Sequence, residues 1–114
     1  MGMVDPAGFL PLKTDVALTL MALEAQSLHG YAIIKDVRHR SEGTVDIQTG
    51  ALYRMLKRLL DDGLIAEVER PKDEPSEDER RRYYRTTPLG RRVLEADLAR
   101  MSRLVQARNR ATRA

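Results

Sequence analysis

The chain has 114 residues, of which 42% are hydrophobic and 32% charged, as expected for one small globular domain. It has no cysteine and no run of about 18 apolar residues, which excludes disulfides, cysteine metal sites and a membrane-spanning helix. The net charge of +3 combines −6 over residues 1–79 with +9 over residues 80–114, an asymmetry typical of proteins that bind nucleic acid or an acidic partner. Because the start of the chain does not resemble a secretory signal, we expect a cytoplasmic protein.

Two helices are predicted after an N-terminal arm of residues 1–12. Thr14 is a candidate N-cap for the first helix, because its hydroxyl can accept a hydrogen bond from a free backbone N–H. The residues that follow are apolar nearly all round, so this helix should be buried on more than one face. The second helix is predicted over residues 30–41, with Gly43 placed to end it.

A third helix is predicted from Thr49, its candidate N-cap, to Gly63. The β-branched residues 44–47 before it predict a very short strand. At about 100° per residue, the apolar face of the helix comprises Leu52, Met55, Leu56, Leu59 and Leu60. The opposite face comprises Gly50, Arg54, Lys57, Arg58 and Asp61, with Tyr53 at its margin.

A β-hairpin is predicted next, with strands over residues 64–70 and 82–87 and a polar, acidic loop over residues 71–79. Alternation in the first strand would place Leu64, Ala66 and Val68 on one side and Ile65, Glu67 and Glu69 on the other. Thr87 and Pro88 then form a strong helix start, with Thr as the cap and Pro at the first helical position.

The final helix carries apolar residues at steps of 4, 3 and 4, which are Leu94, Leu98, Met101 and Val105. This heptad-like stripe on an arginine-rich helix predicts a dimer interface with a second copy of the chain. A basic helix lying on a membrane surface is the alternative, but a narrow stripe without Trp or Phe anchors fits a partner helix better.

Three helices followed by a hairpin are the order of a winged helix-turn-helix, so we predict a mainly α, α+β fold. Residues 13–87 would form a DNA-binding domain and residues 88–114 a dimerisation helix, with the third helix entering the major groove of DNA. Its cations would neutralise phosphates, and amide and hydroxyl groups near its start would reach bases or phosphates. The candidate DNA contacts are Gln48, Thr49, Gly50, Tyr53, Arg54, Lys57 and Arg58, with Arg80, Arg81 and Arg82 at the base of the wing.

Four sequence blocks in this order resemble the PadR family of bacterial transcriptional regulators, in its short subgroup with a single final helix. The blocks are HGYAI (29–33), GALYRMLKRL (50–59), DGLI (62–65) and RYYRTTPLG (82–90). The resemblance implies a homodimeric repressor that binds an inverted-repeat operator in double-stranded DNA through the third helix and the wing. It also implies that the block around Tyr31 is a structural motif, and that a small-molecule effector is possible.

Two features depart from the family pattern. Many members have a basic wing, whereas residues 73–79 here are acidic and should repel phosphate, so we expect that the loop tip does not contact DNA. Some relatives bind flat aromatic compounds in a pocket lined by tryptophan, but this chain has no Trp and only Phe9 as Phe, which argues against a stacking pocket of that type.

An enzyme and a protein-binding module are the rival classes. His29 and His39 are the only side chains with an ordinary pKa near neutrality, and His39 with Glu42 supplies only two possible metal ligands. No glycine-rich phosphate loop occurs, so we expect no enzyme, no cofactor and no metal. A winged helix that docks protein without direct DNA binding stays open, because residues 1–79 are acidic overall.

Overall fold

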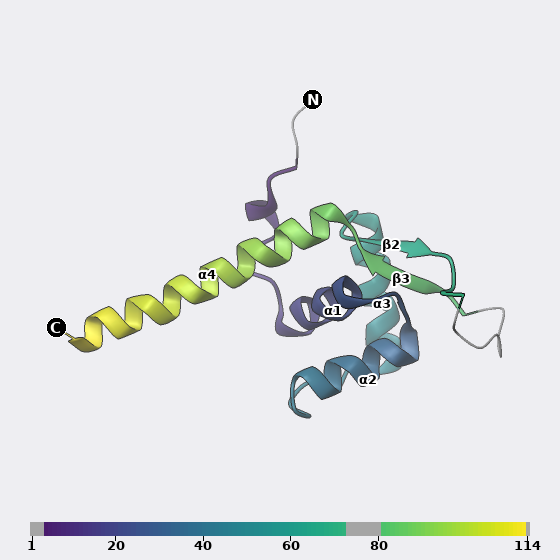
Figure 1. Cartoon of the computed structure of the whole chain (residues 1–114), viewed down its shortest axis with the longest axis horizontal. Helices are drawn as coiled ribbons and strands as arrows, with labels where there is room; N and C mark the ends of the chain where they lie inside the picture. Colours follow the sequence, from purple (N-terminus) through teal and green to yellow (C-terminus); the bar gives the residue numbers. More distant parts are fainter. Residues whose placement is uncertain (1–3, 73–80, 114) are drawn as a thin grey trace.

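The computed structural model describes residues 4–72 and 81–113, and Figure 1 shows the arrangement of its helices and its small sheet. The helical elements are η1 (Pro6–Phe9, a 3-10 helix), α1 (Thr14–Ala25), α2 (Gly30–Arg40), α3 (Thr49–Asp61) and α4 (Pro88–Arg113). The strands are β1 (Leu28–His29), β2 (Ile65–Val68) and β3 (Tyr83–Thr86). The predicted fold class, mainly helical with a small β component, is confirmed.

The sheet is antiparallel, with β3 in the centre of the order β1-β3-β2. Leu28 pairs with Tyr84, and Ile65 pairs with Thr86, so β3 joins the hairpin to the segment between α1 and α2. The prediction of a strand over residues 44–47 was wrong, and β1 was not predicted at all. A two-residue strand depends on pairing with a partner more than fifty residues away, which local composition does not reveal.

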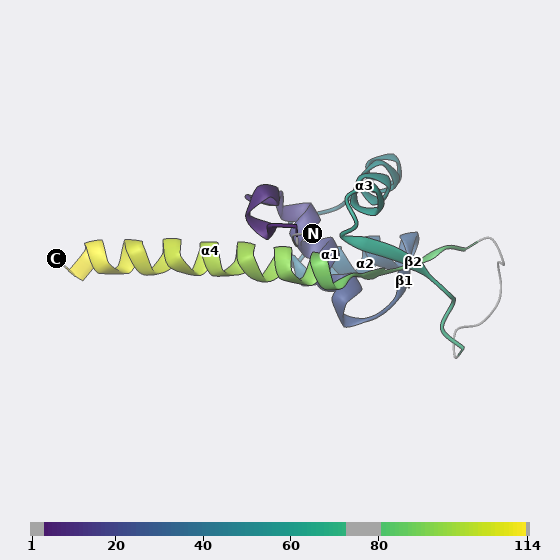
Figure 2. The same ribbon diagram turned by 90° about the horizontal axis from the view of Figure 1, so that it is seen from above.

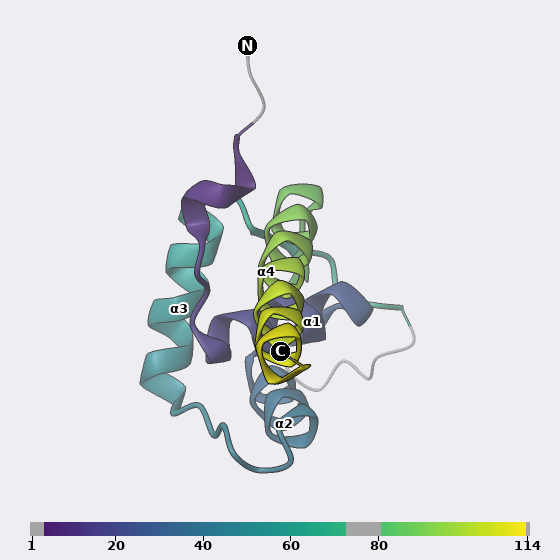
Figure 3. The ribbon, with the colours of Figure 1, turned by 90° about the vertical axis from the view of Figure 1, so that its left-hand side faces the viewer.

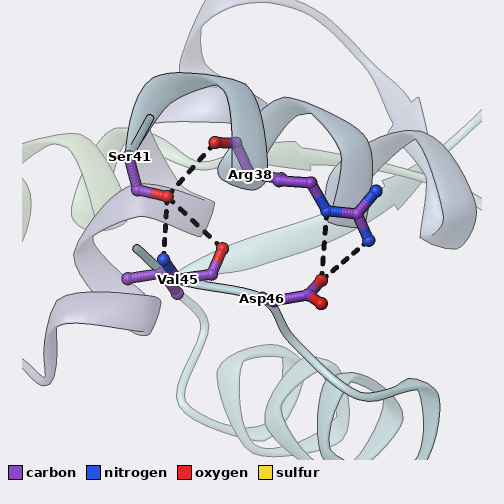
Figure 4. A network of polar contacts seen from close by, with 4 residues as sticks. All are labelled: Arg38, Ser41, Val45 and Asp46. Atoms are coloured by element: carbon purple, nitrogen blue, oxygen red, sulfur yellow. Dashed lines mark hydrogen bonds and ion pairs between the residues drawn. The ribbon is translucent and has the colours of Figure 1, made fainter. Parts of the chain in front are cut away.

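Residues 44–47 belong instead to a polar turn between α2 and α3 (Figure 4). Ser41 Oγ accepts a hydrogen bond from the backbone N–H of Val45 at 3.0 Å and lies 3.3 Å from the carbonyl oxygens of Val45 and Arg38. Arg38 Nη2 donates to Asp46 Oδ1 at 2.7 Å, and this hydrogen bond raises the pKa of Arg38 above its ordinary value. Gly43, with φ +83°, turns the chain after α2 as predicted.

The helix ends match their sequence signals to within two residues. Lys13 and Gln48 are the N-caps of α1 and α3, so Thr14 and Thr49 are the first helical residues rather than the predicted caps. Thr87 does cap α4, because its Oγ1 accepts a hydrogen bond from the N–H of Gly90 at 3.0 Å. Gly63, with φ +75°, ends α3 as expected.

The hydrophobic core lies between α1, the inner faces of α2 and α3, the sheet and the start of α4. As predicted, α1 is buried on several sides. The hydroxyl of Thr86 donates to the carbonyl oxygen of Leu20 at 2.9 Å and so joins β3 to α1. Leu64 and Ile65 are both buried, so the side of the first strand that carries Ile65, Glu67 and Glu69 is covered where the strand begins.

Helix α4 packs on the body with its first turns and then projects beyond it as a rod (Figures 1 and 2). Its 26 residues correspond to a length of about 39 Å. The predicted N-terminal arm contains η1, which contacts α4. The buried Asp97 on α4 accepts hydrogen bonds from the N–H of Leu12 at 3.5 Å and from Arg100 Nε at 2.9 Å. Within the described ranges, no helix has the length and apolarity needed to cross a bilayer.

Candidate nucleic-acid interface

Helix α3 has one buried face and one exposed face, as its periodicity predicts. Leu52, Leu56 and Leu59 are at most 3% exposed and fix the helix to the core. The opposite face is in solvent and carries Gln48, Thr49, Gly50, Tyr53, Arg54, Lys57 and Arg58. Seen along α4 in Figure 3, α3 lies at the edge of the molecule, so its outer face is open to a large partner.

The start of α3 combines polar and small groups. Gln48 is the N-cap through its backbone, since its carbonyl oxygen accepts the N–H of Leu52 at 2.9 Å while its side chain makes no capping bond. A Cβ at Gly50 would meet the guanidinium of Arg54 at 3.4 Å, so Arg54 folds back over the first turn. This end therefore offers an exposed amide, a hydroxyl and a guanidinium within one turn of each other, which suits contact with base edges.

The charge on α3 changes sign toward its C-terminal end. Lys57 Nζ lies 3.2 Å from Asp61 Oδ2, and both side chains are mostly in solvent. Exposed pairs of this kind are worth about 0–1 kcal/mol, so Lys57 is easily redirected to a stronger anion. Arg54, Lys57 and Arg58 line one shallow surface with Asp61 and Asp62. The cations of α3 therefore lie between its polar first turn and its acidic C-terminal end.

The base of the wing contributes Arg81 and Arg82, both exposed. Arg82 Nε lies 4.0 Å from Glu67 Oε1 on β2, a long and solvated pair. Arg80 and the acidic residues 73–79 lie outside the described residues, so their predicted roles stay predictions. Tyr53, Lys57 and Arg82 line one cleft of about 340 Å³ and thereby bring α3 and the wing base together on one side of the molecule.

Two aromatic side chains near this surface are exposed. Tyr53 is 53% exposed, as its place at the margin of the outer face of α3 predicts, whereas Tyr31, expected in a structural motif, is 66% exposed at the start of α2. Sequence reasoning missed Tyr31 as a surface residue because the periodicity of α2 assigns it to the apolar face. That face begins properly at Ile33, which is fully buried.

The predicted dimer stripe divides into two parts. Leu94 is only 2% exposed and belongs to the core of its own protomer. Leu98 and Met101 are 41% and 37% exposed, and Val105 is 60% exposed, so the core of their own protomer does not cover them. Leu104, also 60% exposed, widens the apolar stripe beyond the predicted residues.

Among the described residues, no group of three or more His, Asp or Glu side chains is arranged to hold a metal ion. His39 and Glu42 are both exposed at the end of α2. The ring of His29 packs edge-on against Tyr83, with centroids 5.4 Å apart, which gives His29 a contact within the sheet.

Comparisons with known proteins agree with this geometry. A family model described as the PadR-like family of transcriptional regulators matches residues 19–96. A PadR family transcriptional regulator from Eggerthella lenta is 29% identical, with a TM-score of 0.62 over 94% of this chain and 84% of that chain. A PadR family regulator from Clostridium difficile is 28% identical, with a TM-score of 0.67 over 87% and 97%.

Bacillus subtilis PadR, solved in complex with operator DNA, is similar in fold. It is 24% identical, with a TM-score of 0.62 over 77% of this chain and 48% of that chain. A search among curated protein sequences gave no match. The structural matches confirm the predicted winged helix-turn-helix with a long final helix.

Proposed function

The chain belongs to the PadR-like family of transcriptional regulators, and from this premise we propose that it is a homodimeric repressor that binds double-stranded DNA through α3. The family consists of regulators rather than enzymes, in agreement with the expectation from sequence. The observation that carries the proposal is the two-faced α3. Its leucines are buried, while Arg54, Lys57 and Arg58 are all exposed on the other side.

In this proposal the contacts to DNA are of two kinds. Lys57, Arg58 and the arginines at residues 80–82 neutralise phosphates, which releases counterions and gives affinity that does not depend on sequence. Gln48, Thr49, Tyr53 and Arg54 read base edges, with Gly50 allowing the backbone to approach the duplex. The Bacillus subtilis relative was solved with its operator, which supports the same use of this fold here.

The dimer forms, in this proposal, through α4. Leu98, Met101 and Val105 are apolar, exposed and aligned along α4, and burying them against a second copy removes apolar surface from water. A two-fold dimer would place two α3 helices about 34 Å apart, the spacing of successive major-groove faces. The expected operator is therefore an inverted repeat.

Repression follows if the bound dimer blocks polymerase at a promoter, which places the protein at the bacterial nucleoid in the cytoplasm. A small molecule that binds near the dimer interface would release the operator only if it binds more tightly to a dimer with another α3 spacing. In this proposal the apolar stripe on α4 determines the distance between the two α3 helices. An effector would therefore act at this stripe.

Selection of bound fragments from a genomic DNA pool with the purified full-length chain tests the proposal. We expect recovered fragments to share an inverted repeat with half-sites about 10 base pairs apart. Recovery of no enriched fragment, with protein partners captured instead, would favour a winged helix that docks protein. Sedimentation of the same preparation tests the dimer independently.

A further inference from the structure

A cleft of about 390 Å³ lies between the start of α2 and the beginning of β3. Its lining includes Tyr31 of α2, Tyr53 of α3, and Arg81 and Arg82 at the base of the wing. The cleft is thus lined by phenol and guanidinium groups from three separate elements. The cleft lies beside the exposed face of α3, but residues of α2 and of the wing base line it as well.

Tyr31 is 66% exposed, so it contributes little to the core, and large aromatic residues are enriched at contact surfaces. The ammonium group of Lys35 lies 5.5 Å from the centre of its ring, so a cation stands next to the cleft on this side as well.

The chemistry of the cleft favours an anion with several oxygen atoms. Arg81 and Arg82 supply charged donors, and the phenols of Tyr31 and Tyr53 supply neutral ones. Tyr84 also lines the cleft as a neutral phenol, because a tyrosine is protonated at neutral pH, and burial and the nearby Glu67 raise its pKa further. Glu67 is the opposing acid, but it faces Arg82 at 4.0 Å, and a phosphate would outcompete so long an ion pair for the guanidinium.

We propose that this cleft receives a backbone phosphate of the DNA duplex, held by Arg82 and Arg81 on one side and by the hydroxyl of Tyr31 on the other. The proposal rests on the function proposed above, and it adds the start of α2 to the DNA-contacting surface. Because Tyr53 is shared between this cleft and the face of α3, a phosphate held here fixes how α3 enters the groove.

The test uses the full-length chain and a 30-base-pair duplex of mixed sequence, because a phosphate contact persists on any sequence. The dissociation constant is measured against salt concentration for Arg82→Ala and Tyr31→Phe. We expect Arg82→Ala to lower the slope of log affinity against log salt by about one unit. Tyr31→Phe should weaken binding about 3- to 10-fold with the slope unchanged, since it removes a neutral hydrogen bond.

Matched variants separate a local contact from a general loss of charge. Arg92→Ala removes an exposed arginine on α4 and should leave both the affinity and the slope close to wild type. Glu67→Gln removes the carboxylate that competes for Arg82 and should tighten binding about 2- to 3-fold. Circular dichroism of each variant checks that the fold is intact, as expected for exposed side chains.

The phosphate site would be overturned if Arg82→Ala and wild type had the same slope of log affinity against log salt. It would also be overturned if Arg82→Ala and Arg92→Ala lost the same amount of affinity. Either result would leave DNA binding through α3 in place. Wild-type affinity in Tyr31→Phe would remove Tyr31 from the contact and overturn the role given to α2. If the wild-type chain binds no duplex at any salt concentration, the proposed function itself fails, and the phosphate site fails with it.

Discussion

Gly30 and Tyr53 are in direct contact across the junction of α2 and α3. A Cβ built on Gly30 would stand 2.8 Å from Tyr53 Oη and 3.3 Å from Tyr53 Cζ. Any larger residue at position 30 must therefore displace the phenol. Because Tyr53 is half exposed, burial alone does not fix its side chain. The contact with Gly30 therefore determines the position of its hydroxyl.

Gly30→Ala is expected to weaken DNA binding about 3- to 10-fold, because Tyr53 has to leave its place beside the cleft and one polar contact is lost. Stability should change by less than about 1 kcal/mol, since the end of a flexible side chain can move and alanine favours a helix over glycine. Affinity by fluorescence anisotropy and stability by urea unfolding measure the two effects.

The control for this substitution is Gly8→Ala, where an added Cβ would meet no atom within 4 Å. In a Tyr53→Ala background, Gly30→Ala should cause no further loss of affinity, because the displaced group is already absent. An undiminished additional loss in that background would show that Gly30 acts by another route.

The contact between Gly30 and Tyr53 also illustrates what the sequence can predict here. Periodicity located the buried and exposed faces of α3, because burial on one side follows from local spacing. It did not predict β1, whose two residues become a strand only by pairing with Tyr83 and Tyr84. The exposure of Tyr31 was missed for another reason, since periodicity places Tyr31 on the apolar face of α2, whose buried part begins only at Ile33.

Lys57 is expected to act as a phosphate anchor. Lys57→Ala should weaken binding to all duplexes about equally and reduce the salt slope by about one unit, because one fewer counterion is released. Asp61→Asn removes its exposed ion-pair partner and should have the opposite, smaller effect on affinity. A slope for Lys57→Ala identical to wild type, measured by anisotropy titrations at several salt concentrations, would exclude the phosphate role.

Leu98 is expected to be buried between two copies of α4. Leu98→Asp should convert the dimer to monomer in sedimentation velocity, because a charge in a desolvated apolar seam is costly. Ala99→Asp is the matched control, since it adds the same charge at a neighbouring exposed position on the helix. The dimer should persist in that control. A dimer that persists equally in both variants would contradict the seam.

Gly90 is expected to be essential for stability. A Cβ there would overlap the carbonyl oxygen of Leu64 and stand 2.8 Å from Thr86 Cγ2. The Leu64 carbonyl accepts a hydrogen bond from the N–H of Thr87 at 3.1 Å, so it cannot move aside freely. Gly90→Ala should cost about 3 kcal/mol in the free energy of unfolding, as for other overpacked sites.

Gly50→Ala is the comparison for Gly90→Ala, because a Cβ at Gly50 meets only the mobile guanidinium of Arg54 at 3.4 Å. At this helical position the alanine should stabilise the protein by up to about 1 kcal/mol. If the two variants were equally stable in urea unfolding, the junction of β3 and α4 would be able to accommodate a Cβ at position 90, contrary to this prediction.

Tyr84 gives the protein an expected loss of stability at alkaline pH. Burial, and then the negative charge of Glu67, raise the pKa of the folded-state phenol above its ordinary value of 10.0. The unfolded chain therefore releases this proton more readily, so the stabilising contribution is complete below pH 10 and declines as the pH rises through the raised pKa. The free energy of unfolding of wild type should fall more steeply between pH 9 and 11 than that of Tyr84→Phe.

Urea unfolding at fixed protein concentration across this pH range measures the difference, and the fixed concentration keeps any contribution of dimerisation constant. Tyr31→Phe serves as the control, because it removes a phenol from an exposed position while leaving Tyr84 in place. Glu67→Gln should reduce the alkaline loss in part, since burial is the larger cause of the raised pKa and remains. Parallel pH profiles for wild type and Tyr84→Phe would mean that the phenol is as free to ionise in the folded protein as in the unfolded chain.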